Sequence, residues 1–493
     1  MSSIDPRTPV IVGVGQVKQR FRDYTDAEPY EQAVLMEQAT LLAAADAGAP
    51  ALLNQIDVMA VISGIWGYPD PGRVIADAVG SPDAATLLSA QGGNMPQATV
   101  AHAADLIAAG QADVVVVAGG EATYSKNKLR ALGRKLPRTG VDLARAATYG
   151  EDVTMSSDHE EALGFDRPTS VYPLFESAVR AAAGRSMDDH AVSISELWAR
   201  ANAVSVGNPH AWNRLPLTPE QIRTPGPDNR MVATPYTKLL NSNSFVDYGG
   251  AIIVTSAERA AALGIDTDLW VFPAAATDGH ATLLFSERGD FHTSPAIRHT
   301  GRRALELAGL GIDDIGPMDL YSCFPSVVQI TMAELGIGAD RVFTTTGGLQ
   351  FFGGPMNSYV VHAIASTVEA VRASATPGFV HANGGFITKH SCAVYLPEPP
   401  SRPYVRENVQ AAIDAHPHRM VDTAPDGVGV IESFTVLHGR DGAEKALVTA
   451  LMPDGRRALA NTDDAATMAA METTEHVGVE VRLHPDGRCE VLA

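Results

Sequence analysis

The chain has little cysteine: three residues in 493, at Cys323, Cys392 and Cys489. Cysteines this few and this far apart form neither the disulfide framework of a small secreted domain nor the clustered ligands of a zinc site. A chain of this length does not need such staples, because it hides roughly three-quarters of its surface on folding. We therefore expect a reduced, cytoplasmic protein without a metal site.

Positive charge is also scarce. Lysine and arginine total 37 against 57 acidic residues, a formal net charge of -20. This excess excludes a general binder of nucleic acid or of anionic membranes, because the field of the whole protein repels phosphates. The sequence also lacks an uninterrupted apolar run near the ~18 residues that a membrane helix needs, and its N-terminus does not resemble a signal peptide. We expect a soluble protein, with no membrane and no nucleic acid among its partners.

What the sequence has is a repeated pattern. "GGNMPQATVAHAADLIAAG" from Gly92 precedes the apolar "ADVVVVAGGE", and "GGPMNSYVVHAIASTVEAV" from Gly353 precedes "GFVHANGGF". Each copy is preceded by an Ala-rich helical segment, a glycine and a short strand. Continuous apolar strands that alternate with helices are typical of parallel sheets buried on both faces. The sequence therefore predicts a duplicated α/β unit.

Changes in composition along the chain predict where its domains begin and end. An irregular insertion occupies about residues 122–245, within an N-terminal half at 1–265, and a C-terminal half follows at 266–400. An insertion beside glycine-rich loops is a usual way to build a cover over a ligand. After "LPEPPSRP", short strands separated by Asp-Gly turns predict a small antiparallel domain at 401–493, a β-barrel of the oligonucleotide-binding type.

Glycines at the start of a helix leave its free N–H groups open to a ligand. The helix N-terminus carries roughly +0.5 charge and suits an oxyanion, a thiolate, a carboxylate or a phosphate. We call such a glycine-preceded helix N-terminus a helix mouth. Two helix mouths that converge on one cavity would polarise a group bound there. The alternative is that the glycines only make tight turns. The candidate cradle residues are Gly92, Gly93, Asn94, Gly353, Gly354, Gly384 and Gly385.

Over about residues 8–397 the chain resembles the thiolase superfamily. It is most similar to the sterol-carrier-protein thiolases and to actinobacterial thiolase-like proteins with an extra C-terminal domain. The resemblance rests on "VIVGVGQVK", "ADVVVVAGGE", "ANAVSVGNPHAW", "DYGGAIIVTSAERA", "ALELAGLGIDDIGPMDLYSCF" and "TTGGLQFFGGPMNSYVVHAIA", in this order. It implies a five-layered αβαβα core and a coenzyme A (CoA) thioester as ligand or substrate, with no tightly bound cofactor. It also implies a homodimer, although a monomer is not excluded.

The chain departs from the thiolases at the catalytic positions. The register of the nucleophilic cysteine falls on "GGN" at 92–94, and the Gly-His-Pro motif reads "GGP" at 353–355. The second cysteine matches "AN" at 382–383, and the Asn-Glu-Ala-Phe or His-Asp-Cys-Phe motif reads "YSCF" at 321–324. Covalent acyl transfer needs a thiolate with a base beside it. We therefore predict that classical thiolysis and acetyl-CoA condensation are absent.

Three other residues are candidates for catalysis. Tyr321 stands where the family places a side chain of the oxyanion hole, His390 could act as acid or base, and Asn383 could donate an amide hydrogen to a carbonyl. Each has a structural alternative: a core tyrosine, a histidine capping its loop, and an amide that serves the fold. Cys323 and Cys392 are interpreted as buried small hydrophobic residues.

A basic run, "SKNKLRALGRKLPR", stands out in this acidic chain. It lies in the insertion, where the resemblance implies that the adenosine phosphates of CoA are held, and the alternative is a solvated charged face. The predicted CoA-binding residues are Lys126, Lys128, Arg130, Arg134 and Lys135, with Arg138 beside them.

Three functions remain open at this point. The first is C–C bond chemistry on a CoA thioester without a cysteine nucleophile, of the retro-aldolase or decarboxylative type. The thiolase-like aldolases of steroid side-chain breakdown, which lack the cysteine, use tyrosines and work with a separate barrel protein, offer an analogy. The second is an inactive acyl-CoA binding or carrier protein. The third is a genuine acetyl-CoA acetyltransferase.

Overall fold

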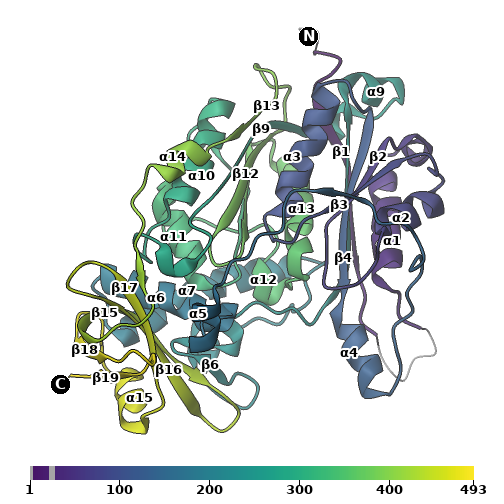
Figure 1. Ribbon diagram of the computed structural model, residues 1–493. Coiled ribbons are helices and arrows are strands. Elements are labelled where there is room, and N and C mark those ends of the chain that lie inside the picture. The colour runs from purple at the N-terminus through teal and green to yellow at the C-terminus, as the bar shows by residue number, and fades with distance from the viewer. Residues whose placement is uncertain (1–3, 22–27, 493) are drawn as a thin grey trace.

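The computed structural model describes residues 4–21 and 28–492, and within them it contains three β-sheets (Figure 1). Two sheets belong to the upper part of the molecule in this view, and the third forms a lobe that carries the C-terminus. This mixed α/β architecture with a separate C-terminal sheet domain confirms the predicted fold class.

The first sheet comes from the N-terminal half. Its central strand β4 pairs antiparallel with β8 and parallel with β2. The run "VVVV" in β4 is fully buried, as suits a β-branched strand covered on both faces. The strands lie in the order β1 (Pro9–Lys18), β8 (Asp247–Ser256), β4 (Val114–Ala122), β2 (Val58–Val61), β3 (Ala85–Ser89) and β5 (Ala147–Tyr149).

The second sheet repeats this arrangement. β12 pairs antiparallel with β9 and β11, just as β8 of the first sheet pairs with β1 and β4. β11 pairs parallel with β10, just as β4 pairs with β2. The predicted duplication is therefore confirmed. One further strand, β13, pairs parallel with β9. The order is β10 (Met318–Leu320), β11 (Gly378–Gly384), β12 (Lys389–Leu396), β9 (Phe272–His280) and β13 (Val405–Asn408).

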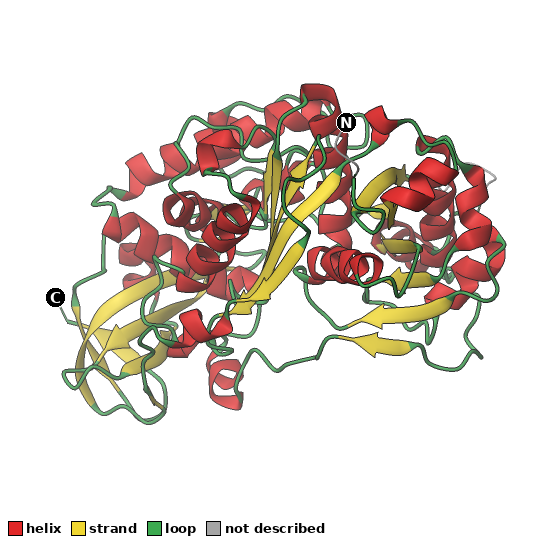
Figure 2. Cartoon of the chain, turned by 90° about the horizontal axis from the view of Figure 1, so that it is seen from above, coloured by secondary structure: helices red, strands yellow, loops and turns green. Residues whose placement is uncertain are grey.

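Helices cover both sheets and fill the space between them (Figures 1 and 2). Two glycines of β8 show the layering, because neighbouring positions of a strand face opposite sides. A Cβ at Gly249 would overlap the backbone of α1, whereas one at Gly250 would meet Val361 and His362 of α13. The layers are α1 (Gln32–Asp46) and α2 (Pro71–Val79) outside the first sheet, α3 (Met95–Ala108) and α13 (Tyr359–Ser374) between the sheets, and α10 (Pro295–Ala308) and α11 (Pro325–Leu335) outside the second.

The insertion after β4 contributes most of the remaining helices. α6 packs against α11 of the second half and against β15 of the third sheet, so it lies between the core and the C-terminal domain. The elements of this region are α4 (Thr123–Ala131), α5 (Asp158–Leu163), α6 (Pro168–Ala182), α7 (Met187–Gly207), α8 (Pro219–Arg223), β6 (Met231–Ala233) and β7 (Tyr236–Thr237). Two short helices lie elsewhere: α9 (Ala257–Ala262) and α12 (Gly348–Phe351).

The third sheet closes on itself as a small barrel. β15 pairs antiparallel with β16 and β18, and a bridge between Asn461 and Arg488 joins β17 to the residue before β19. The insertion takes part as well, because β6 pairs with β15. The elements are α14 (Gln410–Asp414), β14 (Val421–Asp422), β15 (Gly427–His438), β16 (Ala443–Leu451), β17 (Arg457–Thr462), α15 (Ala465–Met471), β18 (Glu480–Leu483) and β19 (Cys489–Val491).

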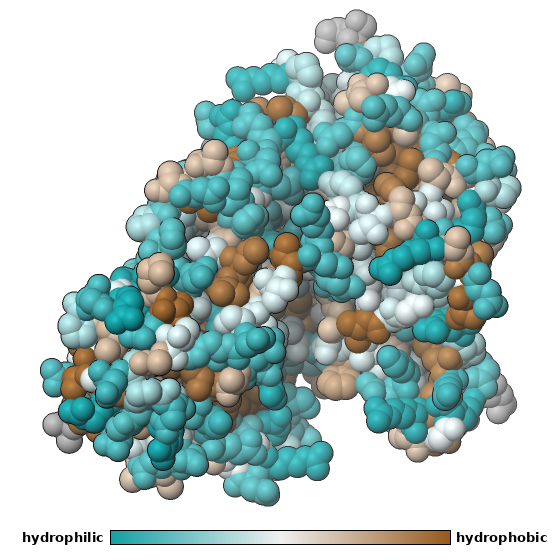
Figure 3. Space-filling view, in the orientation of Figure 1, coloured by the Kyte–Doolittle hydropathy of each residue, from teal (hydrophilic) through white to brown (hydrophobic). Residues whose placement is uncertain are grey.

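The surface reflects this construction. On the face shown in Figure 3, hydrophobic side chains form small patches among hydrophilic ones. A notch opens at the lower edge, between the C-terminal domain and the part of the molecule that carries α4. The insertion thus leaves the space below the two sheets open to solvent on this face.

Glu121, at the end of β4, is a buried carboxyl group with a testable consequence. It is 1% exposed, and burial raises its pKa to about 7. A carboxyl whose pKa is higher in the folded state than in the unfolded state stabilises the fold most at low pH, and this stabilisation is lost as the pH rises through the folded pKa. From about pH 4.5 to above pH 7, we expect Glu121 to reduce the free energy of unfolding by about 3 kcal/mol.

Glu121→Gln should remove this slope while keeping the acceptor for the Ile65 N–H, which lies 2.8 Å from Oε1. The measurement is urea unfolding of both proteins at pH 5, 6, 7 and 8. The difference in unfolding free energy between variant and wild type should grow with pH in the variant's favour, and a constant difference would contradict the assignment.

Candidate active site

The N-terminal ends of α3 and α13 meet at one cavity of about 440 Å³. Gly92 and Gly93 before α3 line it, and so do Gly354, Met356 and Asn357 before α13. The end of β11 and the following turn complete the wall with Asn383, Gly384, Gly385 and Phe386. The two helix mouths predicted from the repeated glycines therefore converge on a single cavity. Gly353 does not line it, since a Cβ there would meet Val246, Tyr248 and Trp212 on the other side of the loop.

Asn94 connects the first mouth to β11. It precedes the first residue of α3 and is 9% exposed. Its Oδ1 lies against Gly384, where an added Cβ would be 2.5 Å away, and it finds no hydrogen-bond partner among the described residues. Gly384 is thus the residue type that this close approach requires, and Asn94 Oδ1 is an acceptor without a partner in the described chain. Asn94 itself, although predicted as part of the cradle, does not line the cavity.

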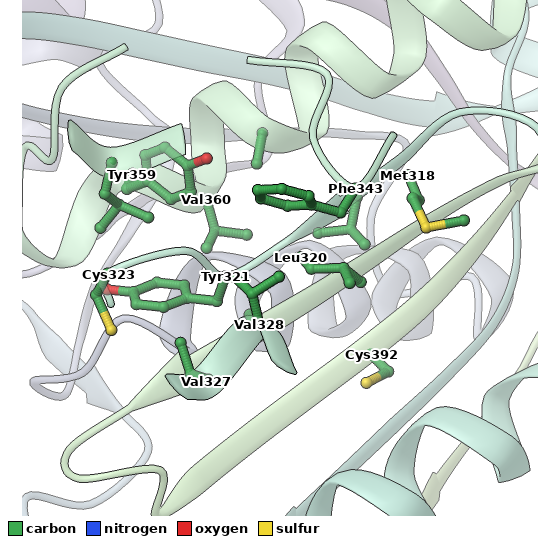
Figure 4. Packing of buried hydrophobic residues seen from close by; sticks show 14 of the residues in the cluster. Met318, Leu320, Tyr321, Cys323, Val327, Val328, Phe343, Tyr359, Val360 and Cys392 are labelled. Atoms are coloured by element: carbon green, nitrogen blue, oxygen red, sulfur yellow. The ribbon is translucent and has the colours of Figure 1, made fainter. Parts of the chain in front are cut away.

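Tyr321 occupies the wall between the two mouths. It follows β10, and its hydroxyl lies so close to Gly93 that a Cβ there would overlap it. Within the described part of the chain, this hydroxyl has no hydrogen-bond partner that meets the usual geometry, although it lines the cavity. Burial raises its pKa well above the ordinary value of a phenol. Tyr321 is therefore a protonated donor at neutral pH. Figure 4 shows its ring extending toward Cys323.

Tyr172 enters the same cavity from α6 in the insertion. Its hydroxyl donates to the Gly385 carbonyl oxygen at 2.8 Å and accepts from Asn383 Nδ2 at 3.0 Å. Its ring stacks on Phe324, with centroids 4.4 Å apart. Burial raises the pKa of this phenol too. Tyr172 could not be identified from the sequence, because an aromatic residue in the helical stretch "SVYPLF" is typical of core packing.

Asn383 is held by this contact. Its Nδ2 is committed to Tyr172, while its Oδ1 is buried and has no partner among residues 4–21 and 28–492. The amide therefore presents an acceptor, and not the donor expected from the sequence, to whatever approaches it. The orientation of an amide group is assigned from its hydrogen bonds. The Tyr172 hydroxyl already donates to Gly385, so it accepts from Asn383, and the nitrogen of the Asn383 amide must face it.

Cys323 is the cysteine that lines the cavity within the described chain. It is 7% exposed, and burial raises the pKa of its thiol to about 12. Thiols react as thiolates, so this group is unreactive at neutral pH. Cys392 lies apart from it in the core (Figure 4), and Cys489 lies in the C-terminal domain.

Comparison with known proteins shows similarity to thiolase-like proteins. The model of the thiolase-like protein type 1 additional C-terminal domain matches residues 408–488. The crystal structure of a monomeric SCP2-thiolase-like protein type 1 from Mycobacterium smegmatis is 29% identical and covers 99% of this chain and 100% of its own, with a TM-score of 0.86. The chain is thus similar to thiolase-like proteins in sequence, and it has a thiolase-like fold.

Two further similarities concern this thiolase-like chain. It is 28% identical over 302 residues to the 17-hydroxy-3-oxo-4-pregnene-20-carboxyl-CoA lyase of Mycobacterium tuberculosis, which is 57% of this chain and 71% of the relative. The structure of an Ltp2–ChsH2(DUF35) aldolase is 20% identical, with a TM-score of 0.61 over 79% of this chain and 98% of that one, and this likeness concerns the fold alone. No helix in the described parts of the chain is long and apolar enough to cross a membrane.

His390 does not face the cavity of the thiolase-like site. It is 1% exposed; its Nδ1 lies 3.1 Å from His381 Nε2, and its Nε2 lies 3.0 Å from the Ile387 carbonyl oxygen. Burial and the neighbouring His381 lower its pKa well below the ordinary value, so the ring is neutral. Because successive residues of β12 alternate, it is Lys389 that points toward the first mouth, with Nζ 2.6 Å from the Gln91 carbonyl oxygen. The structure thus supports the capping alternative for His390.

The predicted CoA-binding run lies on α4 and the loop after it, and none of its residues lines the cavity. Arg134 forms an ion pair with Glu28, and Lys128 lies over the Tyr124 ring at 5.9 Å. Lys126, Arg130 and Lys135 do not line the cavity. The role of this basic run in CoA binding therefore stays a prediction.

Proposed function

We propose that this thiolase-like protein binds a CoA thioester at the two helix mouths and breaks or forms a C–C bond next to the thioester without a cysteine nucleophile. The observation that carries the proposal is the convergence of both mouths on one cavity beside a Tyr321 hydroxyl that has no protein partner in the described chain. The relative named as a carboxyl-CoA lyase supports the same class of reaction.

The reaction that fits these groups is a retro-aldol cleavage. In a β-hydroxyacyl thioester, the hydroxyl loses its proton and becomes a carbonyl, and the bond between the α- and β-carbons breaks. Its electron pair moves onto the thioester as an enolate, and a proton is then added to the α-carbon. Atoms and charges balance without any oxidant or added water. The barrier is lowered by whatever stabilises the enolate oxygen.

The helix mouths and Tyr321 are suited to that role. Backbone N–H groups at a helix start are fixed dipoles that need no reorganisation when charge develops. A phenol is protonated at neutral pH, and burial raises the pKa of Tyr321 further, so its hydroxyl can donate to the oxygen. Tyr172 is already committed to Gly385 and Asn383, so we assign it to holding the turn after β11 in place.

A binding protein without catalysis is the second candidate. The two tyrosines and Cys323 in the wall all have raised pKa values, so none of them is ionised at neutral pH. A cavity whose buried groups are neutral favours binding of a neutral acyl group over acid–base chemistry. Turnover experiments separate the two candidates.

The test is incubation with β-hydroxyacyl-CoA thioesters of several chain lengths, followed by mass spectrometry of the products. We expect a carbonyl compound and a shorter acyl-CoA, and no acyl group on the protein. Cys323→Ala should keep turnover within about threefold of wild type, because its buried thiol is not the nucleophile. A covalent acyl adduct on Cys323 would instead show a thiolase-type reaction. Binding without turnover would support the second candidate.

A further inference from the structure

We propose that a second cavity, on the outer side of the C-terminal half, binds a small organic carboxylate. Its volume is about 520 Å³, within the range of small-molecule sites. Its wall comes from the end of β9, the loop 288–293, the start of α10 and the segment 413–418, which leads from α14 toward the barrel. α10 and α14 lie next to each other (Figure 1). No residue of this wall lines the reaction cavity, so the inference does not depend on the proposed reaction.

Arg288 supplies the charge that a carboxylate would pair with. It lines the second cavity and is 4% exposed. Its Nη1 and Nη2 donate to the carbonyl oxygens of Ile387 and Thr293 at 2.8 and 3.1 Å, while its Nε has no hydrogen-bond partner among the described residues. The guanidinium group is therefore fixed in place by neutral acceptors and keeps hydrogen-bonding capacity for a further group.

The charge of Arg288 is not compensated by a direct ion pair within the described chain. Two carboxylates are near enough to raise its pKa, those of Asp290 and Glu334, but they pair with His292 and Arg298 instead. Burial has the larger effect and lowers the pKa of Arg288 to about 10. A buried cation without a counter-charge is costly, and a bound carboxylate would relieve that cost through paired N–H···O bonds.

The start of α10 adds a second positive feature to the same wall. Pro295 and Ala296 are the first two residues of this 14-residue helix, and both line the cavity. The Ser294 side chain accepts from the Ile297 N–H at 3.3 Å, whereas the Ala296 N–H has no partner in the described chain. A helix N-terminus favours an anion, and here it lies beside the unpaired guanidinium group.

The acidic residues of the wall do not supply the missing counter-charge. Asp290 accepts from the Thr293 N–H at 2.7 Å and from the Thr293 hydroxyl. Asp414 accepts from Gln410 Nε2 at 2.7 Å. Both carboxylates therefore have donors of their own, and the charge left without a partner in this wall is that of Arg288.

The histidines of the wall supply neither a metal site nor a fixed charge. His416 Nε2 lies 2.9 Å from His299 Nε2, so one ring donates and the other accepts, and the two are not both protonated. Burial and the neighbouring His416 also lower the pKa of His299. No group of histidine, cysteine and acidic residues in the described parts of the chain has the arrangement of a metal site.

The apolar part of the wall indicates what kind of acid fits. Ile413, Pro295 and Pro417 line the cavity together with the polar groups. A bare inorganic anion would leave these side chains facing water, whereas an acid with an apolar body would cover them. We therefore commit to an organic monocarboxylate and choose 3-phenylpropionate as the probe.

The experiment is isothermal titration of the full chain with 3-phenylpropionate, with its uncharged amide 3-phenylpropionamide and with inorganic phosphate. We expect 3-phenylpropionate to bind. The amide and phosphate should each bind at least about 10-fold more weakly, because the amide lacks the charge and phosphate lacks the apolar body.

Two variants place the ligand. Arg288→Lys keeps the positive charge but removes the planar group that pairs with a carboxylate through two N–H bonds, so the Kd for 3-phenylpropionate should rise about 10-fold. Arg302→Lys is the matched control, because it makes the same substitution at an exposed position of α10 outside the cavity, and its Kd should equal that of wild type. Ala281→Trp leaves Arg288 in place, adds bulk to the wall and should also raise the Kd at least about 10-fold.

Each outcome decides the inference. No binding of 3-phenylpropionate, or an equal Kd in wild type, Arg288→Lys and Ala281→Trp, would overturn it. Phosphate binding as tight as that of the acid would overturn the organic carboxylate as the ligand. If 3-phenylpropionate binds as expected but no acyl-CoA thioester turns over, the second cavity stands and the proposed reaction fails.

Discussion

Tyr321→Phe is expected to lower kcat for C–C bond cleavage by about 10²–10³-fold and to leave the Kd for the acyl-CoA within about threefold. The size of the effect is that of one donor removed from an oxyanion site. The hydroxyl makes no hydrogen bond within the described chain, so its loss strands no protein group and should not weaken the fold. Steady-state kinetics and titration of the same acyl-CoA separate kcat from binding.

Tyr395→Phe is the matched control. This tyrosine, on β12, is also buried, but its hydroxyl donates to Gln97 Oε1 at 2.8 Å and it does not line the cavity. It should lower stability by about 1 kcal/mol, through one lost hydrogen bond, and leave kcat unchanged. Equal kcat for Tyr321→Phe and wild type would remove Tyr321 from the reaction.

The parts of the site that the sequence could predict are those coded locally. A glycine pair before an apolar helical segment predicts a helix mouth from the local sequence alone. The repeat of this unit predicts the position of the second mouth. This is why Gly92, Gly93, Gly354, Gly384 and Gly385 all line the cavity. The predicted order of strands and helices follows from the same periodicity.

The parts that it could not predict depend on the direction of a side chain or on distant contacts. His390 and Lys389 are neighbours at the start of β12, and a shift of one position along this strand decides which of them faces the first helix mouth. Tyr172 reaches the cavity only because α6 of the insertion folds back over it. Lys18 and Arg20 line one surface pocket together with Arg214, nearly two hundred residues along the chain, and no local pattern marks that pairing.

The C-terminal domain is connected to the reaction cavity through two buried arginines. Arg457 of the barrel donates to the carbonyl oxygens of Ser286 and Arg288, both at 2.6 Å. Arg288 in turn donates to the Ile387 carbonyl oxygen at 2.8 Å, within the turn whose first residues line the cavity. We infer that the barrel braces this wall in cis.

The brace depends on one carboxylate. Glu432 of β15 accepts from Arg457 Nε and Nη2 at 2.6 and 2.7 Å, and Arg457 is fully buried. Burial and the proximity of Arg457 lower the pKa of Arg288 to about 10, so the two cations already repel each other. Without the carboxylate of Glu432, Arg457 would remain buried and uncompensated, a loss that costs about 3–5 kcal/mol.

We therefore expect Glu432→Gln to lower the free energy of unfolding by about 3–5 kcal/mol, as measured by urea unfolding. Glu444→Gln, at an exposed position of β16, removes the same charge from the same sheet and should change it by less than about 0.5 kcal/mol. Loss of the carboxylate frees Arg457, which contacts Arg288, and Arg288 holds the turn after β11 that lines the cavity. The Kd for the acyl-CoA should therefore rise with Glu432→Gln even where the variant is fully folded. An unfolding curve equal to that of Glu444→Gln would show that the ion pair does not stabilise the barrel, and an unchanged Kd for the acyl-CoA would show that it does not support the cavity.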